Sequence, residues 1–212
     1  MTRAPSWTDR LIAACDQGLK TLAAAPTGNR RSPADDVTES PLSRAERAES
    51  ARLMRVNRAG EISAQALYTG QALFAREATT VDHLTDAAGE ELDHLAWCTQ
   101  RLRELGGRPS LLDPAWYVGS VTIGALAGIS GDATSLGFVA ETEHQVESHI
   151  DDHLSRLPPN DAKSRAILVQ MAADEARHGN EASAAGGTAI REPVRSFMAA
   201  GGELLRRIAY RL

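Results

Sequence analysis

The sequence lacks the marks of several protein classes. Aromatic residues make up 4% of the 212 residues, only two cysteines occur, and the formal net charge is −5. Cys15 and Cys98 offer no disulfide framework and fit a reducing compartment. An acidic chain lacks the basic footprint that a phosphate backbone selects, so we expect no nucleic-acid partner. The N-terminal stretch has no apolar segment typical of a secretory signal.

Strand patterns are also missing. No stretch alternates convincingly between apolar and polar residues, whereas alanine is abundant and 42% of the residues are hydrophobic. The sequence therefore predicts an all-α protein. Its length suits a single domain, residues 1–212, with a core large enough to need no covalent cross-links.

The expected helices follow from apolar periodicity and from breaking residues. Ser43 and Glu46 form a capping-box pattern, and Thr79 or Thr80 can cap the next helix. Glycine pairs and a proline pair mark helix ends. The expected helices are 7–24, 43–78, 79–106, 133–157, 161–185 and one from Pro193 to the end. Four long helices predict a bundle over 43–187, preceded by a helix and polar loop (1–42) and followed by a C-terminal helix (188–212).

Three Glu-x-x-His pairs stand out: Glu91/His94, Glu141/His144 and Glu175/His178. With this composition, chance would place such a pair roughly 0.4 times. Residues three apart on a helix share one face, close enough for a carboxylate and an imidazole to hold one metal ion.

The apolar stripes of the four long helices sort these pairs. Glu141 and His144 lie off the stripe of their helix, which makes their spacing accidental, whereas Glu143 lies on it. A lone buried carboxylate is costly unless it is paired or binds a metal, and the stripes carry few cations. Arg58 and Arg177 are expected to point elsewhere. The stripes select six candidate metal ligands: Glu61, Glu91, His94, Glu143, Glu175 and His178.

The spacing repeats within the chain. Glu61 precedes Glu91 by 30 residues, and Glu143 precedes Glu175 by 32. Two hairpins that each carry Glu and then Glu-x-x-His supply the ligands of a di-iron or di-manganese site. The alternative is a polar core without metal. Acidic residues precede both motif glutamates, and we expect Glu90 and Asp174 to accept hydrogen bonds from the metal-bound histidines, each from the opposite half. The alternative for both is ordinary surface charge.

Several segments resemble one known family. "LMRVNRAGEISAQALYTGQA", "EELDHLAWCTQRLRELGGRPSLLDPAWYVGS", "GDATSLGFVAETEHQVESHIDDHLSRLP" and "SRAILVQMAADEARHGNEASAAGG" are similar to the bacterial demethoxyubiquinone hydroxylases, ferritin-like di-iron monooxygenases of ubiquinone biosynthesis. The resemblance covers nearly the whole chain and implies the same six ligands, with Glu91 and Glu175 bridging two iron ions. His149 matches a family histidine near the site, with a role in hydrogen bonding or electron entry; a surface histidine is the alternative. Arg58 stands where a histidine is usual.

The resemblance also implies a reaction and partners. It implies O₂-dependent hydroxylation of the unsubstituted ring carbon of a 2-polyprenyl-3-methyl-6-methoxy-1,4-benzoquinol, with electrons from NADH or a reductase. Other ubiquinone-biosynthesis proteins are expected neighbours. A quinol that lives in lipid implies a membrane surface, so we expect a peripheral protein on the cytoplasmic face of the cell membrane.

Two segments are candidates for membrane contact. Residues 115–131 carry no charge but are short for a bilayer span, so we expect part of this stretch to pack and part to contact lipid. The C-terminal helix is basic and amphipathic, and it either lies in the interface or docks on the bundle.

Two other functions compete with this one. Another ferritin-like di-iron hydroxylase, such as one acting on tRNA, is disfavoured by the acidic charge. A non-enzymatic iron-storage bundle is disfavoured by the glycine-rich apolar stretch.

Overall fold

The structure is a computed structural model that describes residues 7–23 and 26–212. Within these ranges it is all α-helical and contains no strand, as predicted. Residues 1–6, part of the stretch without a secretory signal, and residues 24 and 25, at the expected end of the first helix, lie outside the description. The helices are α1 (Trp7–Ala23), α2 (Arg44–Phe74), α3 (Ala78–Glu104), α4 (Asp113–Ile129), α5 (Asp132–Arg156), α6 (Ala162–Ala184) and α7 (Glu192–Ala209).

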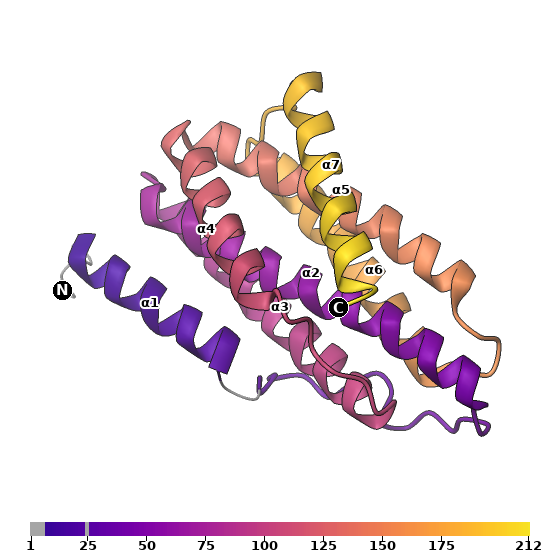
Figure 1. Ribbon diagram of the computed structural model, residues 1–212. Coiled ribbons are helices and arrows are strands. Elements are labelled where there is room, and N and C mark those ends of the chain that lie inside the picture. Colours follow the sequence, from indigo (N-terminus) through magenta and orange to yellow (C-terminus); the bar gives the residue numbers. More distant parts are fainter. Residues whose placement is uncertain (1–6, 24–25) are drawn as a thin grey trace.

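Two helical hairpins form the body of the molecule (Figure 1). α2 packs against α3 and α5 packs against α6, with a short turn inside each pair. The hairpins meet where α3 contacts α6 and α2 contacts α5. α4 connects the hairpins and lies along α2, while α1 and α7 pack on the outside. This is the four-helix bundle with additional helices that the sequence predicts.

A polar layer lies between two apolar clusters in the bundle core. One cluster includes Cys98 and Met171, and the other includes Tyr68 and Ala182. Each of the four long helices passes from one cluster to the other, and the buried residues in between include glutamates and histidines. The stripe periodicity of the sequence therefore places acidic and imidazole groups at the centre of the bundle.

Several helix ends follow from local residues. The capping box is present, since the Ser43 hydroxyl accepts from the Glu46 amide at 3.3 Å and the Glu46 carboxylate accepts from the Ser43 amide at 2.8 Å. Gly106 and Gly186 follow α3 and α6 with φ of 71° and 103°. These left-handed conformations favour glycine and end both helices.

The predicted start of α3 is wrong. The capping position is Glu77 rather than Thr79 or Thr80, and α2 already ends at Phe74. The Glu77 amide donates to the Asp132 carboxylate at 2.8 Å. A carboxylate from the start of α5 thus satisfies backbone donors before α3 and suits the positive end of its dipole, so α3 needs no threonine cap.

The uncharged stretch forms α4, and glycines bring it very close to α2. A Cβ added at Gly124 would lie 2.1 Å from the Leu67 carbonyl oxygen, and one at Gly70 would lie 2.3 Å from the Val121 carbonyl oxygen. The opposite side of α4 is exposed, with Leu126 at 61%. One side of the helix therefore packs and the other faces outward. Nowhere in the described ranges does a helix combine the length and apolar character that a bilayer span requires.

The C-terminal end of α7 is docked on the bundle. Ala209 and Leu205 join a cluster with Val56 of α2. The Arg55 guanidinium donates to the Ala209 carbonyl oxygen at 2.6 Å, which satisfies an acceptor at the end of the helix. Phe197, nearer the start of α7, is 66% exposed. Docking and an exposed apolar face thus occur on the same helix.

Candidate metal centre

All six predicted ligands meet in the polar layer. α2 contributes one glutamate, α5 contributes another, and α3 and α6 each contribute a glutamate and a histidine one turn apart. Each side chain belongs to a residue that is 3% exposed or less. The residues are Glu61, Glu91, His94, Glu143, Glu175 and His178.

Their ligand atoms form two overlapping sets. Within each set the candidate atoms all lie within 4.8 Å of one another, which is close enough to hold a metal ion. Glu91 and Glu175 belong to both sets. The first set adds Glu61 and His94, and the second adds Glu143 and His178.

The two shared carboxylates face both histidines. Glu91 places Oε2 3.1 Å from His94 Nδ1 and Oε1 3.4 Å from His178 Nδ1. Glu175 places Oε1 3.2 Å from His94 Nδ1 and Oε2 3.5 Å from His178 Nδ1. Each carboxylate thus offers one oxygen to each set, which is the arrangement that a bridging ligand requires.

Buried polar atoms at this site lack partners. Among the residues that the structure describes, none hydrogen-bonds to either oxygen of Glu143, to Glu175 Oε2 or to Nδ1 of His178. Buried polar groups nearly always have a hydrogen-bond partner, and a buried polar atom without one lowers the stability of the fold. A pair of metal ions bound by carboxylates and imidazoles would satisfy these atoms, so the residues fit such a group.

The pKa values of the clustered carboxyl groups are shifted in opposite directions. Burial, with the charge of neighbouring glutamates, raises the pKa of Glu143 well above its usual range. Burial alone would raise the pKa of Glu91, but the charge of His94, its hydrogen bond and the nearby imidazole of His178 lower it. The pKa of His178 is raised to about 10 despite burial, because the carboxylates of Glu175 and Glu91, 3.5 and 3.4 Å from its Nδ1, favour the charged imidazole. Without a cation, four crowded carboxylates cannot all stay ionised; divalent ions would relieve that repulsion.

Acidic residues lie behind both histidines. Asp174 Oδ2 is 3.0 Å from His94 Nε2, across the interface of the two halves. Glu90 Oε2 is 3.6 Å from His178 Nε2, an ion-pair distance rather than a hydrogen bond, and this carboxylate binds Arg177. Burial would raise the pKa of Asp174, but hydrogen bonds from His94 and an arginine hold it well below its usual range.

That arginine is Arg30, which sequence reasoning missed. It comes from the loop before α2, and its guanidinium lies 2.8 Å from Asp174 Oδ2 and 3.3 Å from His94 Nε2. Arg58, in contrast, does not pair with the carboxylates of the two ligand sets, as expected. It forms a buried ion pair with Asp113 at the start of α4 and donates to the Thr99 hydroxyl at 3.0 Å.

Among the described residues, the remaining histidines belong to neither ligand set. His144 is exposed, and Glu141 hydrogen-bonds to Gln145, so this Glu-x-x-His pair does not enter the polar layer. His149 is half-buried rather than on the surface, and its Nε2 lies 3.2 Å from Asn57 Oδ1.

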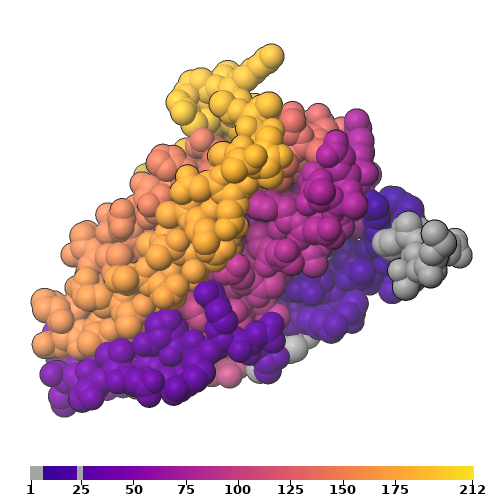
Figure 2. All heavy atoms as spheres, turned by 180° about the vertical axis from the view of Figure 1, so that it is seen from behind, coloured from indigo at the N-terminus to yellow at the C-terminus, as the bar shows by residue number. Residues whose placement is uncertain are grey.

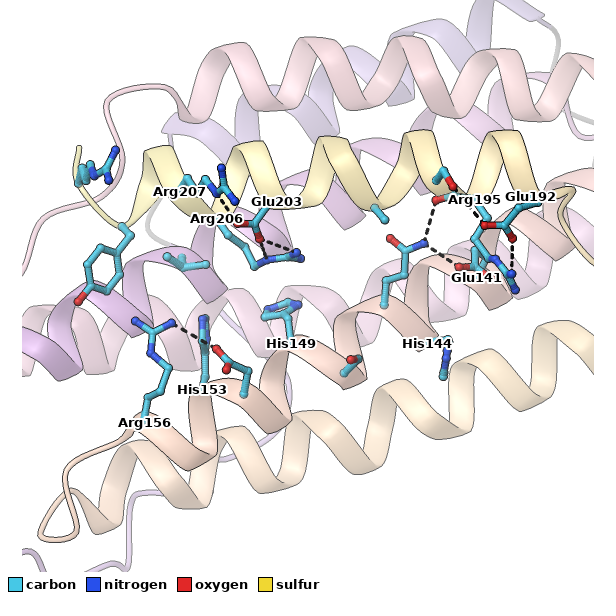
Figure 3. A pocket seen from close by; sticks show the side chains of 18 residues that line it. Glu141, His144, His149, His153, Arg156, Glu192, Arg195, Glu203, Arg206 and Arg207 are labelled. Atoms are coloured by element: carbon cyan, nitrogen blue, oxygen red, sulfur yellow. Dashed lines mark hydrogen bonds and ion pairs between the residues drawn. The ribbon is translucent and has the colours of Figure 1, made fainter.

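His149 and His153 line a groove of about 800 Å³ between α5 and α7 (Figure 3). Burial and nearby positive charge lower the pKa of each histidine to about 3. Both are therefore neutral at physiological pH.

Comparisons with known proteins agree with this architecture. The sequence profile described as "Ubiquinone biosynthesis protein COQ7" matches residues 48–208. A protein of Xanthomonas euvesicatoria named 3-demethoxyubiquinol 3-hydroxylase is 51% identical over 211 residues, which cover 100% of this chain and 97% of the relative. A protein of the same name from Ralstonia pickettii is 51% identical over 96% of this chain and 99% of its own. Because the family profile covers most of the chain and these relatives are similar over its full length, the chain belongs to the COQ7 family of ubiquinone biosynthesis proteins.

Proposed function

We propose that this protein is a di-iron, O₂-dependent monooxygenase that hydroxylates the ring of a demethoxyubiquinol. The relatives that carry the name 3-demethoxyubiquinol 3-hydroxylase are about half identical over the full chain. The observation that carries the proposal is the pair of buried ligand sets with two shared carboxylates. Carboxylate and imidazole ligands suit iron, and paired Glu-x-x-His motifs are typical of di-iron bundles.

The proposed assignment gives each iron one histidine and one carboxylate of its own. Glu61 and His94 would hold the first iron, Glu143 and His178 would hold the second, and Glu91 and Glu175 would contribute to both. Bound iron supplies the redox chemistry that O₂ activation needs, with electrons from an external donor. The protein's own residues hold the geometry: Asp174 accepts the His94 Nε2 hydrogen, which leaves Nδ1 facing the cluster.

The surroundings of the cluster suit an oxidation that must exclude water. Apolar clusters close the polar layer on both sides along the bundle. We assign the quinol ring to the bundle core and the prenyl tail to the Trp116–Gly131 region, because the outer side of α4 is apolar and exposed. The exposed apolar residues of α4 and α7 support peripheral attachment to the cytoplasmic face of the cell membrane.

The decisive experiment compares the parent protein with Glu143→Ala and with Glu141→Ala, a matched change on the same helix outside the cluster. Iron is quantified, the protein is reduced, and a demethoxyubiquinol analogue is added with isotopically labelled O₂. We expect about two irons per chain and a labelled ring hydroxyl from the parent and from Glu141→Ala. We expect Glu143→Ala to lose iron and hydroxylation.

Other outcomes would redirect the assignment. Two irons without ring hydroxylation would keep the metal site and overturn the substrate. A folded parent protein that binds no metal would overturn the site and leave a bundle with a polar core.

A further inference from the structure

The two halves of the metal cluster differ at one position in their local sequences. The first half reads Glu90-Glu91-Leu92-Asp93-His94, and the second reads Asp174-Glu175-Ala176-Arg177-His178. In the second half, the arginine before the histidine binds the carboxylate behind that histidine. In the first half, the equivalent position is an aspartate, so this hairpin supplies no cation behind its own histidine.

The missing cation comes from the loop before α2. Arg30 places Nε 2.9 Å from Asp93 Oδ2 and a terminal nitrogen 2.8 Å from Asp174 Oδ2. The same terminal nitrogen is 3.3 Å from His94 Nε2. The guanidinium also lies over the Trp97 ring, 4.7 Å from its centroid. One side chain thus joins the loop, α3 and α6 directly behind the histidine of the first half.

The loop presents this arginine in a fixed position. The backbone amides of Asn29 and Arg30 both donate to Asp93 Oδ1. Further along, Glu39 pairs with the buried Arg101, and Ala34 is buried in the core. The segment before α2 forms the purple band along the lower edge of Figure 2, next to orange α6. Arg30 lies before residues 48–208, the part that matches the family profile.

We propose that Arg30 is a positioning residue for His94, fixing Asp174 so that this histidine presents Nδ1 to the first metal. The inference rests on the proposed two-metal site. Asp174 Oδ2 accepts hydrogen bonds from both Arg30 and His94 Nε2, while Gln170 donates to Oδ1 at 3.1 Å, so the arginine holds the oxygen that orients the histidine ring. Residues behind a ligating histidine typically change metal affinity 10–100-fold when removed.

The effect is specific to one of the two metals. Arg30 lies within hydrogen-bond distance behind His94, whereas Glu90, behind the histidine of the other set, is held by Arg177 and lies 3.8 Å from Arg30, beyond a hydrogen bond. Loss of Arg30 therefore weakens binding of the first metal and leaves binding of the second close to that of the parent protein.

Stepwise anaerobic titration of metal-free full-length protein with Co²⁺, followed by visible absorption and chelator competition, tests this. For Arg30→Gln we expect one binding step weakened about 10–100-fold and the other unchanged. At one equivalent of Co²⁺, its spectrum should match that of His94→Gln, in which only the second set is complete. Arg30→Lys should recover part of the affinity, since one ammonium replaces the charge but cannot bridge two carboxylates as a guanidinium does.

Arg31→Gln is the matched control, because the Arg31 side chain is 75% exposed and pairs only with loop carboxylates among its described partners. Equal affinities for Arg30→Gln and this control would overturn the inference, as would equal weakening of both steps in a folded variant. If circular dichroism shows that Arg30→Gln does not fold, Arg30→Lys decides by the same criteria. A parent protein that binds no Co²⁺ overturns the proposed metal site as well.

Discussion

Neither oxygen of the Glu143 carboxyl group has a hydrogen-bond partner within the described residues, although the residue is only 1% exposed. Burial, with the charge of neighbouring glutamates, raises its pKa well above its usual range. Such a group costs stability until a metal binds it. At this position, the requirement for a ligand and the requirement for a stable core oppose each other.

We predict that Glu143→Leu stabilises the metal-free protein while it abolishes binding of the second metal. Replacing an unsatisfied buried carboxyl group with an apolar side chain of similar size should raise the free energy of unfolding by about 1–3 kcal/mol. Urea unfolding in the presence of a chelator measures this, and Glu141→Leu on the same helix should change it by less than about 0.5 kcal/mol. A loss of metal-free stability in Glu143→Leu would contradict the prediction.

His153 is 2% exposed, and its Nδ1 lies 3.1 Å from Asn57 Oδ1. Burial, with the charges of Arg156 and Arg206, lowers its pKa to about 3. The unfolded chain takes up a proton as the pH falls below about 6.5, whereas the folded protein does so only near pH 3. His153 therefore makes the folded state progressively less stable as the pH falls through this window.

Replacing this histidine with His153→Gln should flatten the acid side of the stability curve. Between pH 6 and pH 4, we expect the slope of unfolding free energy against pH to fall by up to about 1.4 kcal/mol per pH unit. Urea titrations of metal-free protein at several pH values measure the slope. His144→Gln, at an exposed position of α5, should keep the parent slope, and the same slope in His153→Gln would refute the assignment.

At the scale of elements, the contact between α2 and α4 depends on glycines, which carry no side chain. Gly124 faces the Leu67 carbonyl oxygen so closely that even a methyl group would meet backbone. Because backbone cannot rotate away as a side chain can, the two helices would have to separate. The close approach also holds α4, the helix that connects the two hairpins, against α2.

We predict that Gly124→Ala lowers the free energy of unfolding by about 1–3 kcal/mol, measured by urea unfolding. Gly119→Ala in the same helix is the matched comparison, because a Cβ there meets no atom within 4 Å. Better helix propensity should make that variant more stable by up to about 1 kcal/mol. Equal effects of the two substitutions would show that helix propensity, rather than the helix contact, decides.

At the scale of the whole molecule, apolar side chains are exposed on α4 and α7, which both pack on α2 and lie in front of it in Figure 1. On α4, Ile123, Leu126 and Ile129 are spaced three residues apart and are 36%, 61% and 52% exposed. A stripe of this kind is suited to an apolar partner. Because the proposed substrate is a quinol that dissolves in lipid, the partner that we propose for this stripe is a membrane surface.

Leu126→Glu should weaken binding to anionic phospholipid vesicles at least about tenfold, because a buried leucine contributes about 1.5–3 kcal/mol. Vesicle co-sedimentation measures this. Val169→Glu is the control, since Val169 is 54% exposed but lies on α6, which Figure 2 shows on the reverse side. Equal weakening by both substitutions would contradict the prediction that α4 contacts the membrane.

The sequence by itself determined the helical class, the stripes and the six side chains that meet in the polar layer. The physical reason is local: the 3.6-residue period of a helix fixes which residues share a face. Glu143 rather than Glu141 could be selected in this way, before any contact between helices was known. Whether the six residues bind metal stays a prediction until metal is measured.

Only the tertiary structure decided which distant groups serve these helices. Arg30 is 144 residues from Asp174, Arg58 is 55 from Asp113, and Glu77 is 55 from Asp132. Periodicity states which face of a helix turns inward, but it carries no information on which loop or helix end arrives there. The arginine behind His94, the partner of Arg58 and the start of α3 therefore depend on how the folded chain brings separate segments together.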